Sequence, residues 1–181
     1  MTTKSLTFPF EPQGTVLLRT ERFEVRDVPI AEDKTRAFAI HPGSVCILPV
    51  LDDGRLVVIS NTRPTVGQPL LEVVAGTLEP PELPLECAQR ELQEEAGYIA
   101  DEFISMGGFF IAPGLTNEFM HFFIARGLTE VGQSLEPGED IAVQTASMSE
   151  ILQSVRRGDV CDAKTLAVFF RYQLWLEQSA G

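Results

Sequence analysis

The stretch from Gly76 to Tyr98 constrains the fold of this chain more than any other part of its sequence. Pro84 suits the first turn of a helix, where its missing N–H is no loss, and Gly97 suits the position just after the last turn. Between them apolar residues recur at steps of three and four, which predicts one stripe facing the core. We expect that stripe to contain Leu85, Ala88, Leu92 and Ala96.

The same helix carries a second face of carboxylates. Glu91, Glu94 and Glu95 stand at i, i+3 and i+4, so like charges gather there and repel one another. One interpretation is a solvated acidic face that Arg90 partly neutralises. The other is a site for a hard divalent cation such as magnesium, which takes oxygen ligands from a few carboxylates and from substrate phosphates. The clustering, the helix start and stop signals and the preceding Gly76 loop favour the cation site.

Length and charge limit the classes of function. A chain of 181 residues can form one domain with a core but is too short for two ordinary domains. The formal net charge of −12 argues against a duplex nucleic-acid partner, and it means that a phosphate substrate would need metal ions to screen its charge. No apolar run has the length of a signal peptide core or of a membrane span, so we expect a cytoplasmic protein without membrane association.

Many short strand-like segments surround this helix, and two helices end the chain. We expect residues 44–51 and 55–60 to form a hairpin around a turn at residues 52–54, and residues 70–75 to form one strand. Further strands are expected at residues 16–26, 35–41, 103–111, 119–125 and 140–145, and helices at 148–157 and 163–177. We expect Asp162 to cap the last helix, with an apolar face of Leu166, Phe169, Phe170 and Leu174. This order predicts one mixed α/β or α+β domain.

The glutamate-rich stretch resembles the signature of the Nudix hydrolase family. Gly76 is followed after five residues by Glu82, and after seven more by the run RELQEEAG that ends at Gly97. This matches G-x5-E-x7-R-E-U-x-E-E-x-G-U except at Tyr98, where an aliphatic residue is usual. The resemblance implies an α/β/α sandwich with a mixed sheet. We therefore divide the chain into an N-terminal β extension, residues 1–43, and a Nudix domain, residues 44–181.

The resemblance also implies hydrolysis of a nucleoside diphosphate linked to another moiety, with magnesium as cofactor and manganese as an alternative. The implied metal ligands are the backbone carbonyl of Ala75 and the side chains of Glu91, Glu94, Glu95 and Glu139. The implied catalytic residues are Glu139, Glu95 and Arg90. Arg90 would orient the carboxylates by bidentate pairing, and Glu82 would have a similar supporting role.

The assignment of Glu139 rests on the triplet Glu139-Asp140-Ile141 before a predicted strand, which resembles the ADP-ribose and ADP-sugar pyrophosphatase branch of the family. In that branch a second glutamate is common two residues earlier, where this chain has Pro137. Glu136 therefore stays as an alternative base, and a solvated loop without function stays as the plain alternative.

Three further segments resemble the same branch: LLEVVAGTLEP, Pro113 at sixteen residues after Gly97, and GDVCDAKTL. The branch implies cleavage to AMP and a sugar phosphate. By resemblance the substrate-binding residues would be Arg63 for a phosphate, Glu72 for the nucleoside, Glu118 for the terminal ribose, the loop residues Pro113 and Gly114, and Phe23 for base stacking.

The resemblance further implies that the extension pairs with its counterpart in a homodimer and lends residues to the neighbouring site. Two alternatives to an ADP-ribose or ADP-sugar diphosphatase stay open. One is a Nudix hydrolase of another nucleotide conjugate, such as GDP-mannose or NADH, and the other is a Nudix domain that binds a nucleotide without cleaving it.

Overall fold

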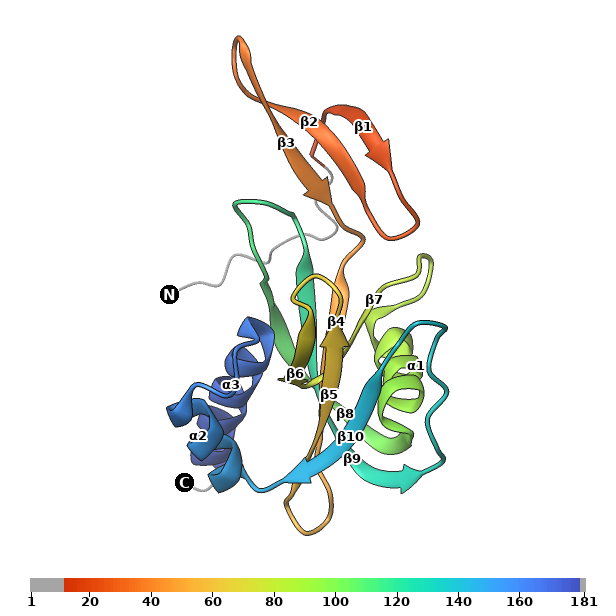
Figure 1. Ribbon diagram of the computed structural model, residues 1–181, viewed down its shortest axis with the longest axis vertical. Coiled ribbons are helices and arrows are strands. Elements are labelled where there is room, and N and C mark those ends of the chain that lie inside the picture. Colours follow the sequence, from red (N-terminus) through yellow and green to blue (C-terminus); the bar gives the residue numbers. More distant parts are fainter. Residues whose placement is uncertain (1–11, 180–181) are drawn as a thin grey trace.

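The N-terminal part of the chain forms its own antiparallel sheet at one end of the molecule (Figure 1). The structure is a computed structural model that describes residues 12–179. In this sheet β1 (Thr15–Arg19), β2 (Glu24–Ala31) and β3 (Lys34–Ile40) pair in chain order. The predicted β extension is thus confirmed, although residues 1–11 lie outside the described residues. The turn between β1 and β2 is closed by Thr20, whose hydroxyl donates to the carbonyl of Phe23 at 2.6 Å.

Two further sheets make up the rest of the β structure. One has the order β7-β4-β9-β8, from β4 (Ser44–Pro49), β7 (Val74–Thr77), β8 (Tyr98–Phe110) and β9 (Phe119–Glu130). The other has the order β10-β5-β6, from β5 (Leu56–Arg63), β6 (Gln68–Glu72) and β10 (Ile141–Ala146). β4 runs parallel to β9 and antiparallel to β7, so the predicted mixed sheet is confirmed.

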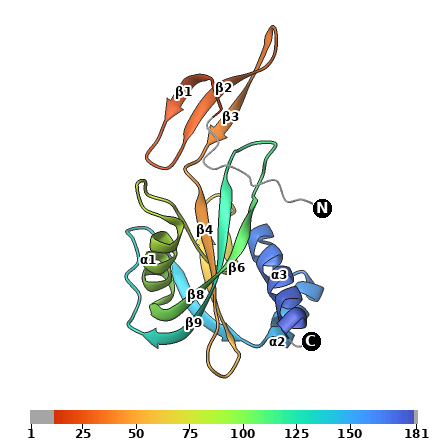
Figure 2. The same cartoon turned by 180° about the vertical axis from the view of Figure 1, so that it is seen from behind.

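Helices cover the sheets from both sides (Figure 2). α1 (Pro84–Ala96) lies on one side, and α2 (Met148–Arg157) and α3 (Ala163–Ser179) lie on the other. Every residue of β4 is buried, because alternate side chains face opposite layers: Val45 and Ile47 join the core under α1, while Cys46 and Leu48 join the core under α3. The α/β/α sandwich is therefore confirmed. Within residues 12–179 no helix combines the length and the apolar character needed to cross a membrane.

Two predictions about the strands are wrong: one concerns a strand pairing and the other the continuity of a strand. The turn at residues 52–54 is present, with the N–H of Gly54 donating to the carbonyl of Leu51, but β4 and β5 lie in different sheets. Their ends are joined by an isolated bridge between Val50 and Leu56, not by a ladder of paired residues. The predicted strand at residues 70–75 is two strands, β6 and β7. The break falls at Val73, whose N–H donates to the Thr165 hydroxyl of α3 instead of to a neighbouring strand.

The buried faces of two helices also differ from the predicted ones. Leu85 is 43% exposed, because α1 is rotated so that Cys87, Glu91 and Glu95 point inward beside Ala88, Leu92 and Ala96. On α3 the buried apolar side chains are Val168, Phe169 and Tyr172, whereas Phe170 is 63% exposed. Asp162 does cap α3, since its carboxylate accepts from the N–H of Thr165 at 3.0 Å.

Candidate active site

The helix that carries the acidic cluster has well-defined ends. Pro84 occupies the first turn, and the N–H of Leu83 donates to the carboxylate of Glu86 at 2.7 Å. Gly97 ends the helix with a φ of 73° while its N–H returns to the carbonyl of Gln93, a conformation that glycine adopts without steric penalty. These local features fix where α1 begins and ends.

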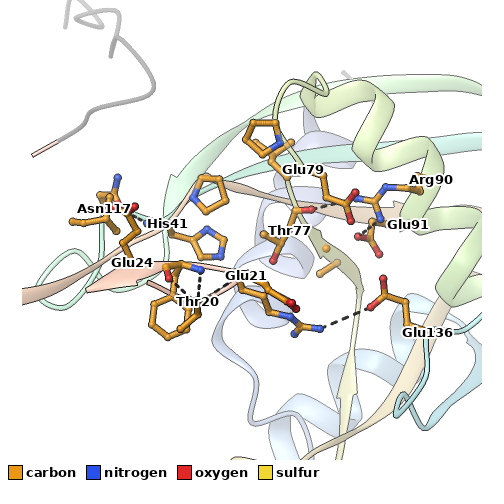
Figure 3. Close-up of a pocket in the computed structure, with 18 of the residues that line it drawn as sticks. Thr20, Glu21, Glu24, His41, Thr77, Glu79, Arg90, Glu91, Asn117 and Glu136 are labelled. Carbon is orange, nitrogen blue, oxygen red and sulfur yellow. Dashed lines mark hydrogen bonds and ion pairs between the residues drawn. The ribbon is translucent and has the colours of Figure 1, made fainter. Parts of the chain in front are cut away.

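A cavity of about 990 Å³ lies between the extension and the Nudix signature (Figure 3). One wall is the turn between β1 and β2, which contributes Phe23. The opposite wall is the acidic face of α1, and the loop before β10 contributes Glu136 and Glu139. Arg63 and Ala75 also line it. The cavity therefore brings eight of the predicted site residues together: Phe23, Arg63, Ala75, Arg90, Glu91, Glu94, Glu95 and Glu139.

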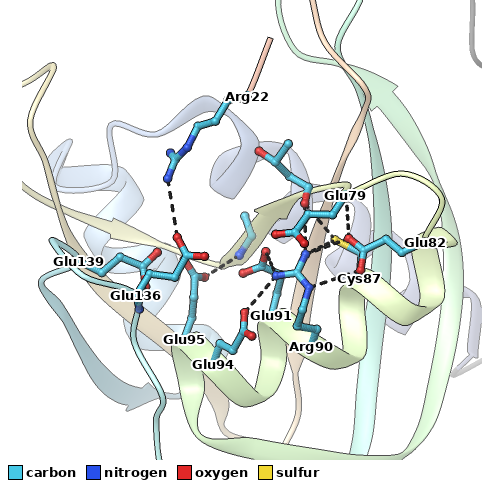
Figure 4. A network of polar contacts seen from close by, with 12 residues as sticks. Arg22, Glu79, Glu82, Cys87, Arg90, Glu91, Glu94, Glu95, Glu136 and Glu139 are labelled. Carbon is cyan, nitrogen blue, oxygen red and sulfur yellow. Dashed lines mark hydrogen bonds and ion pairs between the residues drawn. The ribbon is translucent and has the colours of Figure 1, made fainter. Parts of the chain in front are cut away.

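Arg90 is the centre of a polar network on this wall (Figure 4). Its Nη1 donates to Glu91 at 2.7 Å and to Glu94 at 3.0 Å, and its Nη2 donates to Glu82 at 2.9 Å and to the carbonyl of Thr77 at 3.2 Å. One guanidinium thus holds three carboxylates and ties them to β7. The predicted pairing of Arg90 with the carboxylates is present in this geometry.

Gly76 allows the helix to pack its acidic face directly on β7. A Cβ placed on Gly76 would lie 1.8 Å from the carboxylate of Glu91, so no other residue type leaves that carboxylate where it is. Next to it, the N–H of Ala75 donates to Glu95 at 2.9 Å. The signature glycine and the signature glutamates are therefore parts of one contact between strand and helix.

Burial makes the two innermost carboxyl groups weaker acids than usual. Glu91 is 9% exposed and Glu95 is 3% exposed. Removal from water raises the pKa of Glu91 to about 7 and that of Glu95 to about 8, and the negative charge of Glu139 adds a smaller upward contribution to both. Arg90 opposes the rise at Glu91. Because these buried carboxylates have lost the stabilisation that water gives to their charges, a bound cation would stabilise their ionised form.

Glu136 and Glu139 both line the cavity and are joined by a hydrogen bond. The N–H of Glu136 donates to the carboxylate of Glu139 at 2.9 Å, and the carboxylate of Glu136 lies 3.9 Å from Arg22 of the extension. Glu139 acts electrostatically on Glu91 and Glu95, whereas Glu136 faces the extension (Figure 4). The arrangement favours Glu139 as the residue that works with the α1 carboxylates.

Four predicted substrate residues do not line the cavity. Glu72 is 1% exposed and pairs with Arg63, and Glu118 accepts from the Ser44 hydroxyl at 2.8 Å. Pro113 and Gly114 are exposed in the loop between β8 and β9. Their predicted substrate contacts stay predictions.

Some residues in or next to the cavity were not among the predicted site residues. Asn117 lines it and accepts from the N–H of His41 through its side-chain oxygen at 2.7 Å, while Arg22 reaches it from the extension. Lys164 stands behind it, paired with Glu72. Asn117 is adjacent to Glu118 and Lys164 lies in the quoted segment GDVCDAKTL, but neither position has a spacing that marks it as part of a site.

The donor groups are of the kind that a hard divalent cation takes. Glu91, Glu94 and Glu95 offer carboxylate oxygens beside the backbone of Ala75, with the close approach that Gly76 permits. Within residues 12–179 no three His, Cys, Asp or Glu side chains converge as a finished coordination shell, and Arg90 holds two of the carboxylates. Magnesium commonly completes its coordination with water and substrate phosphates, so an incomplete protein shell fits it.

The chain is similar to several known proteins. A family model described as NUDIX domain matches residues 40–169. The chain is 34% identical over 145 residues to an ADP-ribose pyrophosphatase of Bacillus subtilis, covering 78% of each protein. It is 29% identical over 160 residues to a methanol dehydrogenase activator of Bacillus methanolicus, covering 86% of each. The crystal structure of an ADP compounds hydrolase shares the fold, with a TM-score of 0.75 and 22% identity over 98% of each chain.

Proposed function

The chain belongs to the Nudix family of hydrolases, and on that premise we propose that it cleaves the pyrophosphate bond of ADP-ribose or a related nucleoside diphosphate sugar. The products are AMP and a sugar phosphate. The observation that carries the proposal is that the acidic face of α1, Arg63 and Phe23 all line one cavity. One end of this cavity suits metal-bound phosphates, and the other suits an aromatic base.

The proposed metal is magnesium, with manganese as an alternative. Its proposed ligands are Glu91, Glu94, Glu95, Glu139 and the carbonyl oxygen of Ala75. A divalent ion at these oxygens would offset the charge of the two phosphates and lower the pKa of a bound water. Arg90 keeps Glu91 and Glu94 in position through its hydrogen bonds.

The remaining roles belong to side chains of the cavity. Glu139 takes the proton from the attacking water, for which its place beside Glu91 and Glu95 is suited. Arg63 donates to a substrate phosphate, and Phe23 stacks on the base. In the structure Phe23 lines the cavity of its own chain, which supports this role.

We also propose that the protein is a homodimer joined through the extension. β1 is an edge strand, and its residues Val16, Leu17 and Leu18 are 42%, 58% and 54% exposed. An exposed apolar edge strand is a ready template for pairing with another chain. A second copy would cover this edge by the same surface, as two-fold symmetry requires.

A substrate panel tests the proposed reaction. Purified protein is incubated with ADP-ribose, GDP-mannose or NADH in the presence of magnesium, manganese or EDTA, and products are separated by ion-exchange chromatography. We expect AMP and ribose 5-phosphate from ADP-ribose with a divalent ion, none with EDTA, and at least about 100-fold slower formation by the Glu95→Gln variant. Faster turnover of GDP-mannose or NADH would reassign the substrate, and binding of nucleotide without any turnover would identify a non-catalytic domain.

A further inference from the structure

A buried chain of ion pairs stands behind Arg63. Glu72 is 1% exposed and accepts from Arg63 Nε at 2.9 Å and Nη2 at 2.6 Å. The same carboxylate accepts from Lys164 Nζ of α3, which reaches it across 92 positions of sequence. Arg63 lines the cavity, and Lys164 does not. Glu72 therefore links a residue of the cavity wall to a residue of the C-terminal helix.

The far end of this chain is anchored in the first turn of α3. The carboxylate of Asp162 accepts from Lys164 Nζ at 3.0 Å and from the Thr165 hydroxyl at 2.6 Å. The Thr165 oxygen in turn accepts from the N–H of Val73 at 3.0 Å, at the break between β6 and β7. Both charged groups of the helix turn are thus fixed against the sheet, and Thr165 is fully buried.

Glu72, the middle member of the chain, is the least exposed of its three side chains. The exposed fraction is 36% for Arg63, 10% for Lys164 and 1% for Glu72. Both oxygens of Glu72 are already used, so a contact between Glu72 and substrate would first require a buried ion pair to open, which is unfavourable. In contrast, Arg63 Nη1 has no hydrogen-bond partner among residues 12–179 and is available to a ligand in the cavity.

We infer that Lys164 is a positioning residue for substrate binding, which acts through Glu72 to hold Arg63 toward the cavity. Lys164 compensates the negative charge on the second oxygen of Glu72 and keeps that carboxylate fixed. The guanidinium of Arg63, which donates to Glu72, therefore presents Nη1 in one orientation. Without Lys164, Glu72 can turn and Arg63 turns with it. The inference rests on the proposed function, since it takes Arg63 to bind a phosphate of the substrate.

In this scheme Arg63 contacts the substrate both before and during the reaction. A loss of its orientation therefore weakens the binding of the substrate and of the transition state by similar amounts. Such a loss raises KM while kcat changes little. A merely structural role of Lys164 would lower the stability and the active fraction of the enzyme, and would leave KM unchanged. The two roles therefore differ in the kinetic parameter that moves.

The test is a double-mutant cycle with Lys164→Met and Arg63→Met, assayed with ADP-ribose and magnesium. We expect Lys164→Met to raise KM about tenfold with kcat within about threefold, and to have almost no further effect on KM in the Arg63→Met background, because residues that act as one unit are not additive. Lys34→Met, on the exposed β2–β3 hairpin, is the matched control and should leave both parameters unchanged. Lys164→Arg keeps the cation and should restore a KM close to that of the wild type.

Additive effects of the two substitutions, or an unchanged KM in Lys164→Met, would overturn the inference. If Lys164→Met does not fold, the same cycle with Lys164→Gln, which keeps a donor for Glu72 but not the charge, decides the matter by the same criterion. Absence of ADP-ribose turnover in the wild-type protein would instead refute the proposed function, so the two failures are distinguishable.

Discussion

Replacing Gly76 with alanine tests whether the close contact between β7 and α1 sets the position of the metal-binding carboxylates. The added Cβ would lie 1.8 Å from the Glu91 carboxylate, whereas ordinary contacts begin near 3.4 Å. The carboxylate must therefore move by about 1.6 Å. Because a misplacement of about 1 Å can cost about 10²-fold in rate, we expect kcat to fall at least about 100-fold.

Stability should respond differently from activity. The φ of Gly76 is not in the left-handed region, and the atoms that the Cβ meets belong to the end of a flexible side chain. Glu91 can turn away into the cavity, and alanine also loses less conformational entropy than glycine on folding, by about 0.5–1 kcal/mol. We therefore expect Tm to stay within a few degrees of the wild type while kcat collapses.

Gly54→Ala is the matched control. Gly54 lies in the turn between β4 and β5 with a φ of 82°, and nothing lies within 4 Å of an added Cβ. A left-handed conformation costs an L-residue about 1–2 kcal/mol, so this variant should lose several degrees of Tm and keep normal kcat. The kcat is measured by ADP-ribose turnover with magnesium, and the Tm is measured by differential scanning calorimetry. Turnover of Gly76→Ala within about threefold of the wild type would refute the reasoning.

Four further outcomes are expected. Glu91→Gln, Glu94→Gln and Glu95→Gln should each lower kcat at least about 100-fold in steady-state assays with saturating magnesium, with little loss of stability, because one metal ligand contributes several kcal/mol to the transition state; near-normal turnover would exclude the metal assignment. Glu139→Gln should lower kcat strongly with KM within a few-fold while Glu136→Gln does little, and the reverse pattern would transfer the role of base to Glu136. In EDTA, the Tm of the wild type should fall as pH rises from about 4.5 to about 8, because burial raises the pKa of Glu95 from 4.5 to about 8 in the folded state and protonation therefore favours folding. Glu95→Gln should flatten this dependence of Tm on pH. A wild-type Tm that rises over this range would contradict the reasoning. Light scattering at micromolar concentration should give the mass of a dimer, and deletion of residues 1–43 should weaken both association and substrate binding; a monodisperse monomer of the full chain would count against the dimer.

The sequence by itself determined the features that depend on neighbours along the chain. The limits of α1 follow from Pro84 and Gly97, because helix termini are set by a few adjacent backbone groups. The gathering of Glu91, Glu94 and Glu95 follows from the helical period, which places such residues on one face. The requirement for Gly76 was visible only through the family signature; its physical reason, the contact with Glu91, appears in the structure.

Tertiary structure alone decided the features that join distant segments. Strand pairing depends on which distant segments compete for the same backbone donors, and local pattern does not encode this. For that reason β4 pairs with β7 and β9 instead of β5, and the donation from Val73 to Thr165 splits one predicted strand into two. The burial of Glu72 is decided in the same way, because Arg63 on the neighbouring strand and a lysine 92 residues later supply the charges that make an interior carboxylate tolerable.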